Sequence, residues 1–222
     1  MGSIWRVSCD MVNLIFDFDG TLYNSYKGIK MAFESSAIQV YQSGVEFKPG
    51  NIGPPIAEIH EIYFKNKTPY EKKQFINTFR NLYDYEYCDQ GEWYDGAKDL
   101  HTQLNKEHFR LICLTNKPFE PLQKILLSQS IGIEFDMISC IDDKQFKSNY
   151  KSERLKMIKN LTHNSAEKWV YIGDTQEDYE AALKNNCIFV HASYGYGIVD
   201  GKNLLFINSL RELLSVLDNV LS

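Results

Sequence analysis

Short apolar runs recur along the chain and predict the strands of a buried sheet. Each run is apolar on nearly consecutive positions, a pattern that is typical of strands buried on both faces. The runs cover Val12–Phe16, Arg110–Leu114, Phe135–Cys140, Trp169–Ile172 and Cys187–His191. Strands of this kind occur mainly in parallel sheets that helices cover on both sides.

Stretches with helical spacing lie between these runs. They cover Ala97–Leu104, Pro118–Leu127, the stripe formed by Leu155, Ile158 and Leu161, Gln176–Leu183, and Leu210–Leu217. Pro118 stands near the first turn of its stretch, where the missing N–H costs nothing. The alternation of strands and helices predicts an α/β fold with a doubly wound, Rossmann-like parallel sheet.

Residues 26–92 break this alternation, because they contain no convincing buried strand. Helical patterns cover Gly28–Tyr41, Ile56–Lys65 and Tyr70–Tyr85, and Asn51–Pro55 reads as a turn between two of them. We therefore predict an α/β core of residues 11–23 and 93–222, and an inserted helical cap of residues 24–92. Such an insertion would lie over the carboxyl ends of the strands, where α/β proteins bind ligands.

The composition narrows the class of protein. Hydrophobic residues make up 44% of the 222 residues and the net charge is -5, so the chain can bury a core and gains nothing from a nucleic-acid backbone. No apolar stretch approaches the roughly 20 residues that span a bilayer, and no long apolar signal segment opens the chain. We expect a soluble, cytoplasmic monomer or homodimer without a nucleic-acid or membrane surface. Residues 1–10 fit no predicted element.

The cysteines show no disulfide or zinc pattern. They number five, an odd count, and no pair has C-x-x-C spacing. Cys113 and Cys140 lie in apolar runs, so we expect them to be small core residues.

Candidate chemistry begins directly after the first predicted strand, at Asp17, Asp19, Gly20 and Thr21. Carboxylates two positions apart point to the same side if the strand geometry continues. Crowding two negative charges is costly unless a cation lies between them or one carboxyl stays protonated. The pair therefore indicates a metal site, an acid/base role or both. A polar turn between a strand and a loop is the alternative interpretation.

This segment resembles motif I of the haloacid dehalogenase superfamily, D-x-D-G-T followed by an apolar residue, here Leu22. The resemblance extends from Val12 to about Leu217. By layout, the helical insertion is similar to the C1-type cap of the phosphoglycolate phosphatase-like group. The resemblance implies that Asp17 is the nucleophile, that Asp19 is the acid/base, and that the turn at Gly20 and Thr21 helps to bind phosphate.

The remaining motifs of that superfamily occur in the expected order. Thr115 at the end of an apolar run resembles motif II, with Asn116 as a supporting residue, although both could simply cap the helix at Pro118. Asp174 and Asp178 match the motif IV pattern G-D-x-x-x-D, and their alternative role is helix capping.

The motif III lysine is the least defined of these assignments. Lys151 precedes the helical stripe that begins at Leu155, and it would neutralise the nucleophile and the phosphate. Lys144 and Lys147 lie close by and compete for the role.

The resemblance as a whole implies a Mg²⁺-dependent phosphatase that hydrolyses a small-molecule phosphate monoester, such as phosphoglycolate, through an aspartyl-phosphate. Its metal residues would be Asp17, Asp19 through its backbone carbonyl, Asp174, and Asp178, which would order the waters of the metal or hold Lys151. A sugar phosphomutase, a nucleotidase and a pyrophosphatase are alternatives within the superfamily. A catalytically silent interaction module is the non-enzyme alternative, and it predicts a missing motif residue, whereas none is missing. The sequence does not indicate which phosphorylated metabolite is the substrate.

Overall fold

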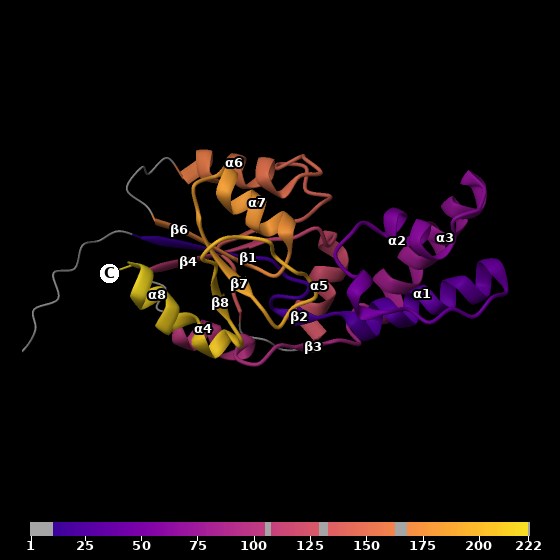
Figure 1. Ribbon diagram of the computed structural model, residues 1–222, viewed down its shortest axis with the longest axis horizontal. Coiled ribbons are helices and arrows are strands. Elements are labelled where there is room, and N and C mark those ends of the chain that lie inside the picture. The colour runs from indigo at the N-terminus through magenta and orange to yellow at the C-terminus, as the bar shows by residue number, and fades with distance from the viewer. Residues whose placement is uncertain (1–10, 105–107, 129–132, 163–167, 222) are drawn as a thin grey trace, which may run out of the picture.

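A parallel sheet forms the centre of the computed structural model, which describes residues 11–104, 108–128, 133–162 and 168–221 (Figure 1). Its six strands lie in the order β5-β4-β1-β6-β7-β8, and every pairing is parallel. The strands are β1 (Val12–Phe16), β4 (Phe109–Leu114), β5 (Met137–Ser139), β6 (Lys168–Gly173), β7 (Ile188–Ala192) and β8 (Leu205–Ile207). The chain winds outward from β1 in both directions, which confirms the predicted doubly wound α/β fold. Residues 1–10, with Cys9, lie outside the described residues.

Helices cover both faces of this sheet (Figure 1). One layer holds α6 (Lys151–Thr162) and α7 (Gln176–Lys184), and the opposite side holds α4 (Leu100–Gln103), α5 (Phe119–Ser128) and α8 (Leu213–Leu221). Side chains along β1 alternate between them, because Ile15 belongs to the cluster of the first layer while Leu14 and Phe16 belong to that of the second. Burial on both faces explains why the strands read as continuous apolar runs.

The strands that the sequence pattern missed are short. They are β8, together with β2 (Tyr23–Asn24) and β3 (Glu92–Trp93), which pair antiparallel. Two or three residues cannot show a period-2 pattern, and β8 lies at the edge of the sheet. Cys113 and Cys140 are buried free thiols, as predicted. Within the described ranges, no helix is both long and apolar enough to cross a membrane.

The inserted helices lie beside the carboxyl ends of the strands (Figure 1). They are α1 (Tyr26–Tyr41), α2 (Ile56–Tyr63), α3 (Pro69–Leu82) and the π-helical segment η2 (Tyr83–Tyr87). Their buried aromatic side chains belong to the same cluster as one face of the sheet. The ring of Phe33 lies among those of Phe47, Tyr63 and Phe75, at centroid distances of 4.8, 4.9 and 5.0 Å respectively. The division of the chain into core and cap at residues 24–92 stays a prediction.

Candidate active site

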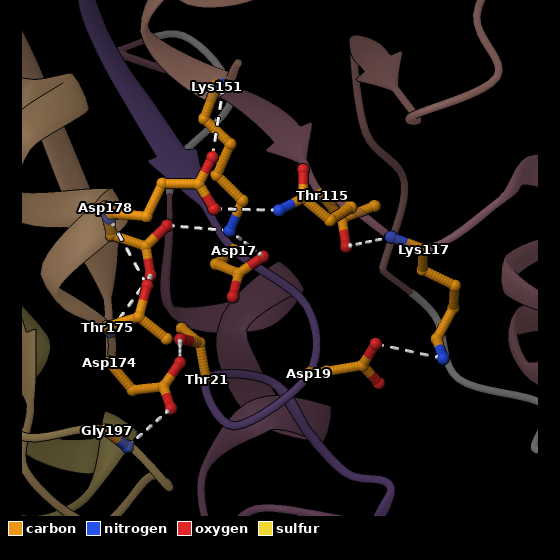
Figure 2. A network of polar contacts seen from close by, with 12 residues as sticks. Asp17, Asp19, Thr21, Thr115, Lys117, Lys151, Asp174, Thr175, Asp178 and Gly197 are labelled. Carbon is orange, nitrogen blue, oxygen red and sulfur yellow. Dashed lines mark hydrogen bonds and ion pairs between the residues drawn. The ribbon is translucent and has the colours of Figure 1, made fainter. Parts of the chain in front are cut away.

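The carboxyl ends of the three central strands meet at a cavity of about 720 Å³ beneath the inserted helices. Asp17 follows β1, Thr115 follows β4 and Asp174 follows β6. Parallel strands end at the same edge of a sheet, so residues far apart in the sequence come together here. Figure 2 shows how these side chains converge.

Lys151 is the lysine that the fold places against Asp17. It is the first residue of α6, it is 3% exposed, and its Nζ lies 2.8 Å from both Asp17 Oδ1 and Asp178 Oδ1 (Figure 2). Burial would lower the pKa of Lys151, but the charges of Asp17 and Asp178 outweigh this and raise it. Lys151 therefore stays charged and neutralises part of the acidic cluster.

Burial raises the pKa of Asp17 well above its usual range, and the ion pair with Lys151 opposes this rise only in part. The nearby carboxylates of Asp178 and Asp174 push it further upward. The protein alone thus leaves the negative charge at this position under-compensated.

Asp178 uses both carboxylate oxygens within the protein. Its Oδ1 accepts hydrogen bonds from Lys151 Nζ and from the Tyr171 hydroxyl, each at 2.8 Å. Its Oδ2 accepts from the Thr175 backbone N–H at 3.0 Å and from the Thr175 hydroxyl at 2.6 Å, which forms a capping box at the start of α7. Burial pushes the pKa of Asp178 upward, yet Lys151 and these hydrogen bonds outweigh burial and lower it. With about four lone-pair sites in use, this carboxylate suits holding Lys151 better than direct metal contact.

Asp174 is fully buried and held by donors from two separate loops. Its Oδ1 accepts from the Thr21 hydroxyl at 3.2 Å, and its Oδ2 accepts from the backbone N–H groups of Tyr196 at 2.8 Å and Gly197 at 3.3 Å. Burial, followed by the charge of Asp178, raises the pKa of Asp174 to about 6. Thr21 thus uses its hydroxyl on Asp174, a contact that the sequence did not indicate.

Two glycines let the backbone approach Asp174 closely. Gly20 has φ +87°, and a Cβ there would lie 2.3 Å from Asp174 Oδ2. A Cβ on Gly195 would lie 2.3 Å from the Asp174 Cβ and 2.5 Å from the Gly20 carbonyl oxygen. Any side chain at either position would displace the carboxylate, so both glycines are required by this packing.

Asp17, Asp174 and Asp178 form a group that could hold a metal ion. All three are buried, and one oxygen from each lies within 4.8 Å of the others. Within the described residues, Lys151 is the ammonium paired with this group, so three carboxylates face one positive charge. Hard oxygen ligands with excess negative charge suit a divalent cation such as Mg²⁺.

Asp19 does not join this group, because the strand ends before it. β1 stops at Phe16, and the backbone N–H groups of Leu22 and Tyr23 both fold back onto the Phe18 carbonyl, at 2.9 and 3.0 Å. The Asp19 side chain consequently points away from Asp17, and its Oδ2 lies 3.0 Å from Lys117 Nζ (Figure 2). The expected same-side arrangement of the two carboxylates, which assumed a continuing strand, is not what the fold forms.

Thr115 and Asn116 lie beside the cluster, at the end of β4. Thr115 is buried, and its hydroxyl accepts from the Lys117 backbone N–H at 3.1 Å. Asn116 links two elements, because its Nδ2 donates to Glu177 at 2.8 Å and its Oδ1 accepts from Arg154 at 2.5 Å.

Arg154 is a site residue that the sequence analysis missed. It is fully buried on α6, one turn after Lys151, and donates to the Thr115 carbonyl at 2.7 Å. The charge of this guanidinium lies directly behind the strand end that carries Thr115. Its position three residues after Lys151 is a helical spacing, but an arginine in a mixed helix gives no signal of burial.

Lys117 and Tyr196 were missed as well. Lys117 directly follows the Thr115–Asn116 pair, so its neighbourhood was a usable signal. Tyr196 lies between Gly195 and Gly197, and this glycine-flanked segment after the fifth apolar run was the only hint of the loop on Asp174.

Comparisons with known proteins agree with the fold and the order of the motifs. Residues 14–192 match the family model described as haloacid dehalogenase-like hydrolase. A phosphoglycolate phosphatase from Aquifex aeolicus is 26% identical over 93% of this chain and 96% of its own length. A pyrophosphatase, PpaX, from Halalkalibacterium halodurans is 27% identical over 74% of this chain and 75% of its own length. The crystal structure of a predicted phosphatase from Clostridium acetobutylicum superposes with a TM-score of 0.76, at 26% identity, over 94% of this chain and 99% of that one.

The family model covers most of the chain, and the protein therefore belongs to the haloacid dehalogenase-like hydrolases. Within that family it is an enzyme of the phosphatase-like kind, similar to phosphoglycolate phosphatases.

Proposed function

We propose that this protein is a Mg²⁺-dependent phosphatase that hydrolyses a small-molecule phosphate monoester through an aspartyl-phosphate on Asp17. The observation that carries the proposal is the position of Asp17. Its carboxylate lies at the strand-end wall of the 720 Å³ cavity and is held at 2.8 Å by the buried ammonium of Lys151. A fixed carboxylate beside a positive charge is a suitable nucleophile toward a phosphoryl group that approaches from the cavity.

The proposed reaction has two steps. The Asp17 carboxylate attacks phosphorus, the bond to the leaving alcohol breaks, and Asp19 gives its proton to the departing oxygen. Asp19 then removes a proton from a water molecule, whose oxygen attacks phosphorus and releases inorganic phosphate while Asp17 is restored. Asp19 lines the same cavity as Asp17, which supports its role in both proton transfers.

The oxygens of the transferring phosphoryl group need donors and positive charge. Thr115, Asn116 and Lys151 line the cavity, so Thr115 and Lys151 would supply them and Asn116 would support the site. Gly20 and Thr21 would act from behind, because the Thr21 hydroxyl donates to Asp174. Lys151 has a second task, because it keeps Asp17 oriented through its pairing with Asp178.

Residues present on this chain fit a magnesium ion. Asp17 and Asp174 would hold it with the backbone carbonyl of Asp19, and Asp178 would act from behind through water and Lys151. When bound, the ion supplies charge neutralisation on the phosphoryl oxygens and on the crowded carboxylates. The raised pKa values of Asp17 and Asp174 support this assignment, because burial, and after it the neighbouring carboxylates, disfavour their charged forms, and a bound cation would offset this.

For the substrate we propose a small phosphorylated metabolite resembling phosphoglycolate, acted on in the cytoplasm by a monomer or homodimer. The Aquifex aeolicus relative carries that name, and the similarity extends over nearly its whole length. Pyrophosphate is the second candidate, because the Halalkalibacterium halodurans relative is named a pyrophosphatase.

A phosphate-release assay on metal-depleted protein tests the proposal. Phosphoglycolate, pyrophosphate, nucleoside monophosphates and sugar phosphates are each supplied with and without Mg²⁺, and a phosphomutase would instead reveal itself by isomerised sugar phosphate. We expect release of phosphate from at least one ester, only with Mg²⁺. Absence of release from every ester, by folded protein saturated with Mg²⁺, would contradict the proposal.

A further inference from the structure

A buried lysine connects the core to the inserted helices at the edge of the cavity. Lys117 follows β4 and is 4% exposed. Its Nζ lies 3.0 Å from Asp19 Oδ2 and donates a hydrogen bond to the Tyr83 hydroxyl. The ammonium also lies 4.6 Å from the centroid of the Tyr83 ring, close enough for a cation–π contact. No role proposed above uses Lys117 or Tyr83.

Tyr83 belongs to the inserted helices. It opens the π-helical segment η2, immediately after α3, and it is 3% exposed. Its ring stacks on Phe79 of α3 with an interplanar angle of 2° at 5.7 Å, and both rings line the cavity. π-Helical turns occur often at functional sites. Because Tyr83 directly follows α3, its hydroxyl can bind Lys117 only when α3 lies in this position.

Asp19 depends on Lys117 for its orientation. Within the described part of the chain, Asp19 forms its ion pair with Lys117, through Oδ2. The other oxygen, Oδ1, is buried and has no hydrogen-bond partner among the described residues. Lys117 thus fixes one oxygen, while no hydrogen bond within the described residues occupies the other.

We propose that Lys117 is a positioning residue that couples docking of the inserted helices to the placement of Asp19, with Tyr83 as their contact. The inference rests on the proposed role of Asp19 as proton donor. With the helices docked, Lys117 is held by Tyr83 and directs Asp19. When they move away, Lys117 loses that partner, and Asp19 is no longer fixed.

Lys117 takes no direct part in the proton transfer of the first step. As the ester P–O bond breaks, the electron pair stays on the leaving oxygen, which takes the proton of Asp19, while Lys117 keeps its own protons. Misplacement of Asp19 therefore slows the hydrolysis of esters whose leaving group needs this proton. Esters of acidic phenols leave as stable anions and need it much less.

Two esters separate this positioning role from a general structural one. The kcat/KM values are measured for an alkyl phosphate and for an aryl phosphate with an acidic phenol, since kcat/KM reports the steps through the first loss of leaving group. For Tyr83→Phe and Lys117→Met, we expect kcat/KM to fall about 10- to 100-fold with the alkyl ester and less than about threefold with the aryl ester. Asp19→Asn should show the same pattern with a larger loss, and Lys117→Met should add little in that background.

Matched controls lie on η2 and on α5, the helix that follows Lys117. Tyr85 is on η2, is 61% exposed, and places its hydroxyl 3.4 Å from Glu120, so Tyr85→Phe removes a phenol from the same turn. Lys124 on α5 donates to the Tyr85 carbonyl at 2.7 Å, so Lys124→Met removes a lysine that also joins the two regions. Both controls should keep both kcat/KM values. Tyr83→Phe, which keeps the ring, decides alone if Lys117→Met fails to fold.

Equal losses with both esters, or no loss in Tyr83→Phe, would overturn the positioning role while the proposed function stands. If the unmodified protein hydrolyses neither ester with Mg²⁺, the proposed function fails first and this inference with it.

Discussion

The two walls of the cavity differ in kind. The wall formed by strand ends is charged and densely hydrogen-bonded, with Asp17, Lys151 and Asp178 buried in one network. The wall formed by the inserted helices is mostly apolar and includes Ile52 and Ile59. A charged, rigid wall can carry out one reaction on a group common to many substrates. An apolar wall discriminates by size and shape, so we assign reaction chemistry to the first wall and substrate choice to the second.

The packing that supports the strand-end wall also differs from the packing that supports the helical wall. The strand-end wall stands on a sheet that is buried on both faces, which limits its movement. The helical wall stands on packed aromatic rings that include Phe33, Phe47 and Phe75, and the short β2–β3 ribbon lies between it and the sheet. Substitutions of Asp17 and Lys151 on the strand-end wall should therefore affect every ester alike, and those of apolar residues on the helical wall should affect esters unequally.

The largest expected effect comes from Asp17→Asn. This change removes the proposed nucleophile, and we expect the rate of phosphate release to fall at least about 10⁴-fold for every ester. Lys151 keeps its contact with Asp178, so the fold should survive, as thermal unfolding can verify. Substantial activity under conditions that prevent deamidation would show that Asp17 is not the nucleophile.

Lys151→Met should affect both stability and activity. It leaves two buried carboxylates without their shared cation, and loss of one partner from a buried pair costs about 3–5 kcal/mol of the free energy of unfolding. Urea unfolding at neutral pH measures this cost. Lys147→Met is the matched control, because Lys147 is an exposed lysine just before the same helix and should change stability by less than about 0.5 kcal/mol. A similar small effect in both variants would remove Lys151 from the site.

The dependence of stability on pH and Mg²⁺ tests whether the negative charge of the buried carboxylates is under-compensated. Burial and Asp178 raise the pKa of Asp174 to about 6, whereas an Asp in the unfolded chain titrates near about 3.9. Between these values the folded protein holds a proton that the unfolded chain has released. Without a cation, the contribution of Asp174 to stability therefore falls as pH rises from about 4 to about 6 and stays low above it.

Mg²⁺ should consequently raise Tm more at about pH 7.5 than at about pH 5, because the ion competes with protons for these carboxylates. At about 100 times its Kd, a ligand adds about 2.7 kcal/mol of stability. Asp174→Asn should lose most of this shift, as calorimetry can measure. An undiminished shift in Asp174→Asn would mean that the ion binds elsewhere.

The smallest effect should come from the helical wall. Ile56 opens α2 and lines the cavity while half-buried, so Ile56→Ala enlarges the cavity with little cost in stability. We expect kcat/KM to change by about tenfold or less, and by different factors for small and bulky esters. Equal losses with all esters would erase the distinction between the two walls.

The strand-end wall was largely visible in the sequence, and the reasons are local. An apolar run followed at once by Asp17, Thr115 or Asp174 reveals a strand end, and parallel strands bring such ends together. The sequence did not predict that Lys117 and Arg154 belong to the site. Their roles depend on their position in the tertiary structure, which leaves no periodic pattern in the sequence.

The direction of the Asp19 side chain was not predicted for a different reason. A strand that continued past Phe16 would have placed Asp19 beside Asp17, but the turn around the Phe18 carbonyl ended it. The predicted helices of the cap were close to those observed, yet their amphipathic pattern says only that they pack. It does not say which ester the cavity accepts, because shape selectivity has no sequence signature.

Trapping the covalent intermediate tests the account most directly. Asp19→Asn should form the aspartyl-phosphate from an aryl phosphate with Mg²⁺ and release it slowly, because the base for the attacking water is missing. Mass spectrometry of the rapidly acidified protein should then show one added phosphoryl group, in the peptide that carries Asp17, and none in Asp17→Asn/Asp19→Asn. A phosphoryl group on any other residue, or equal labelling of the double variant, would contradict the assignment of Asp17 as nucleophile.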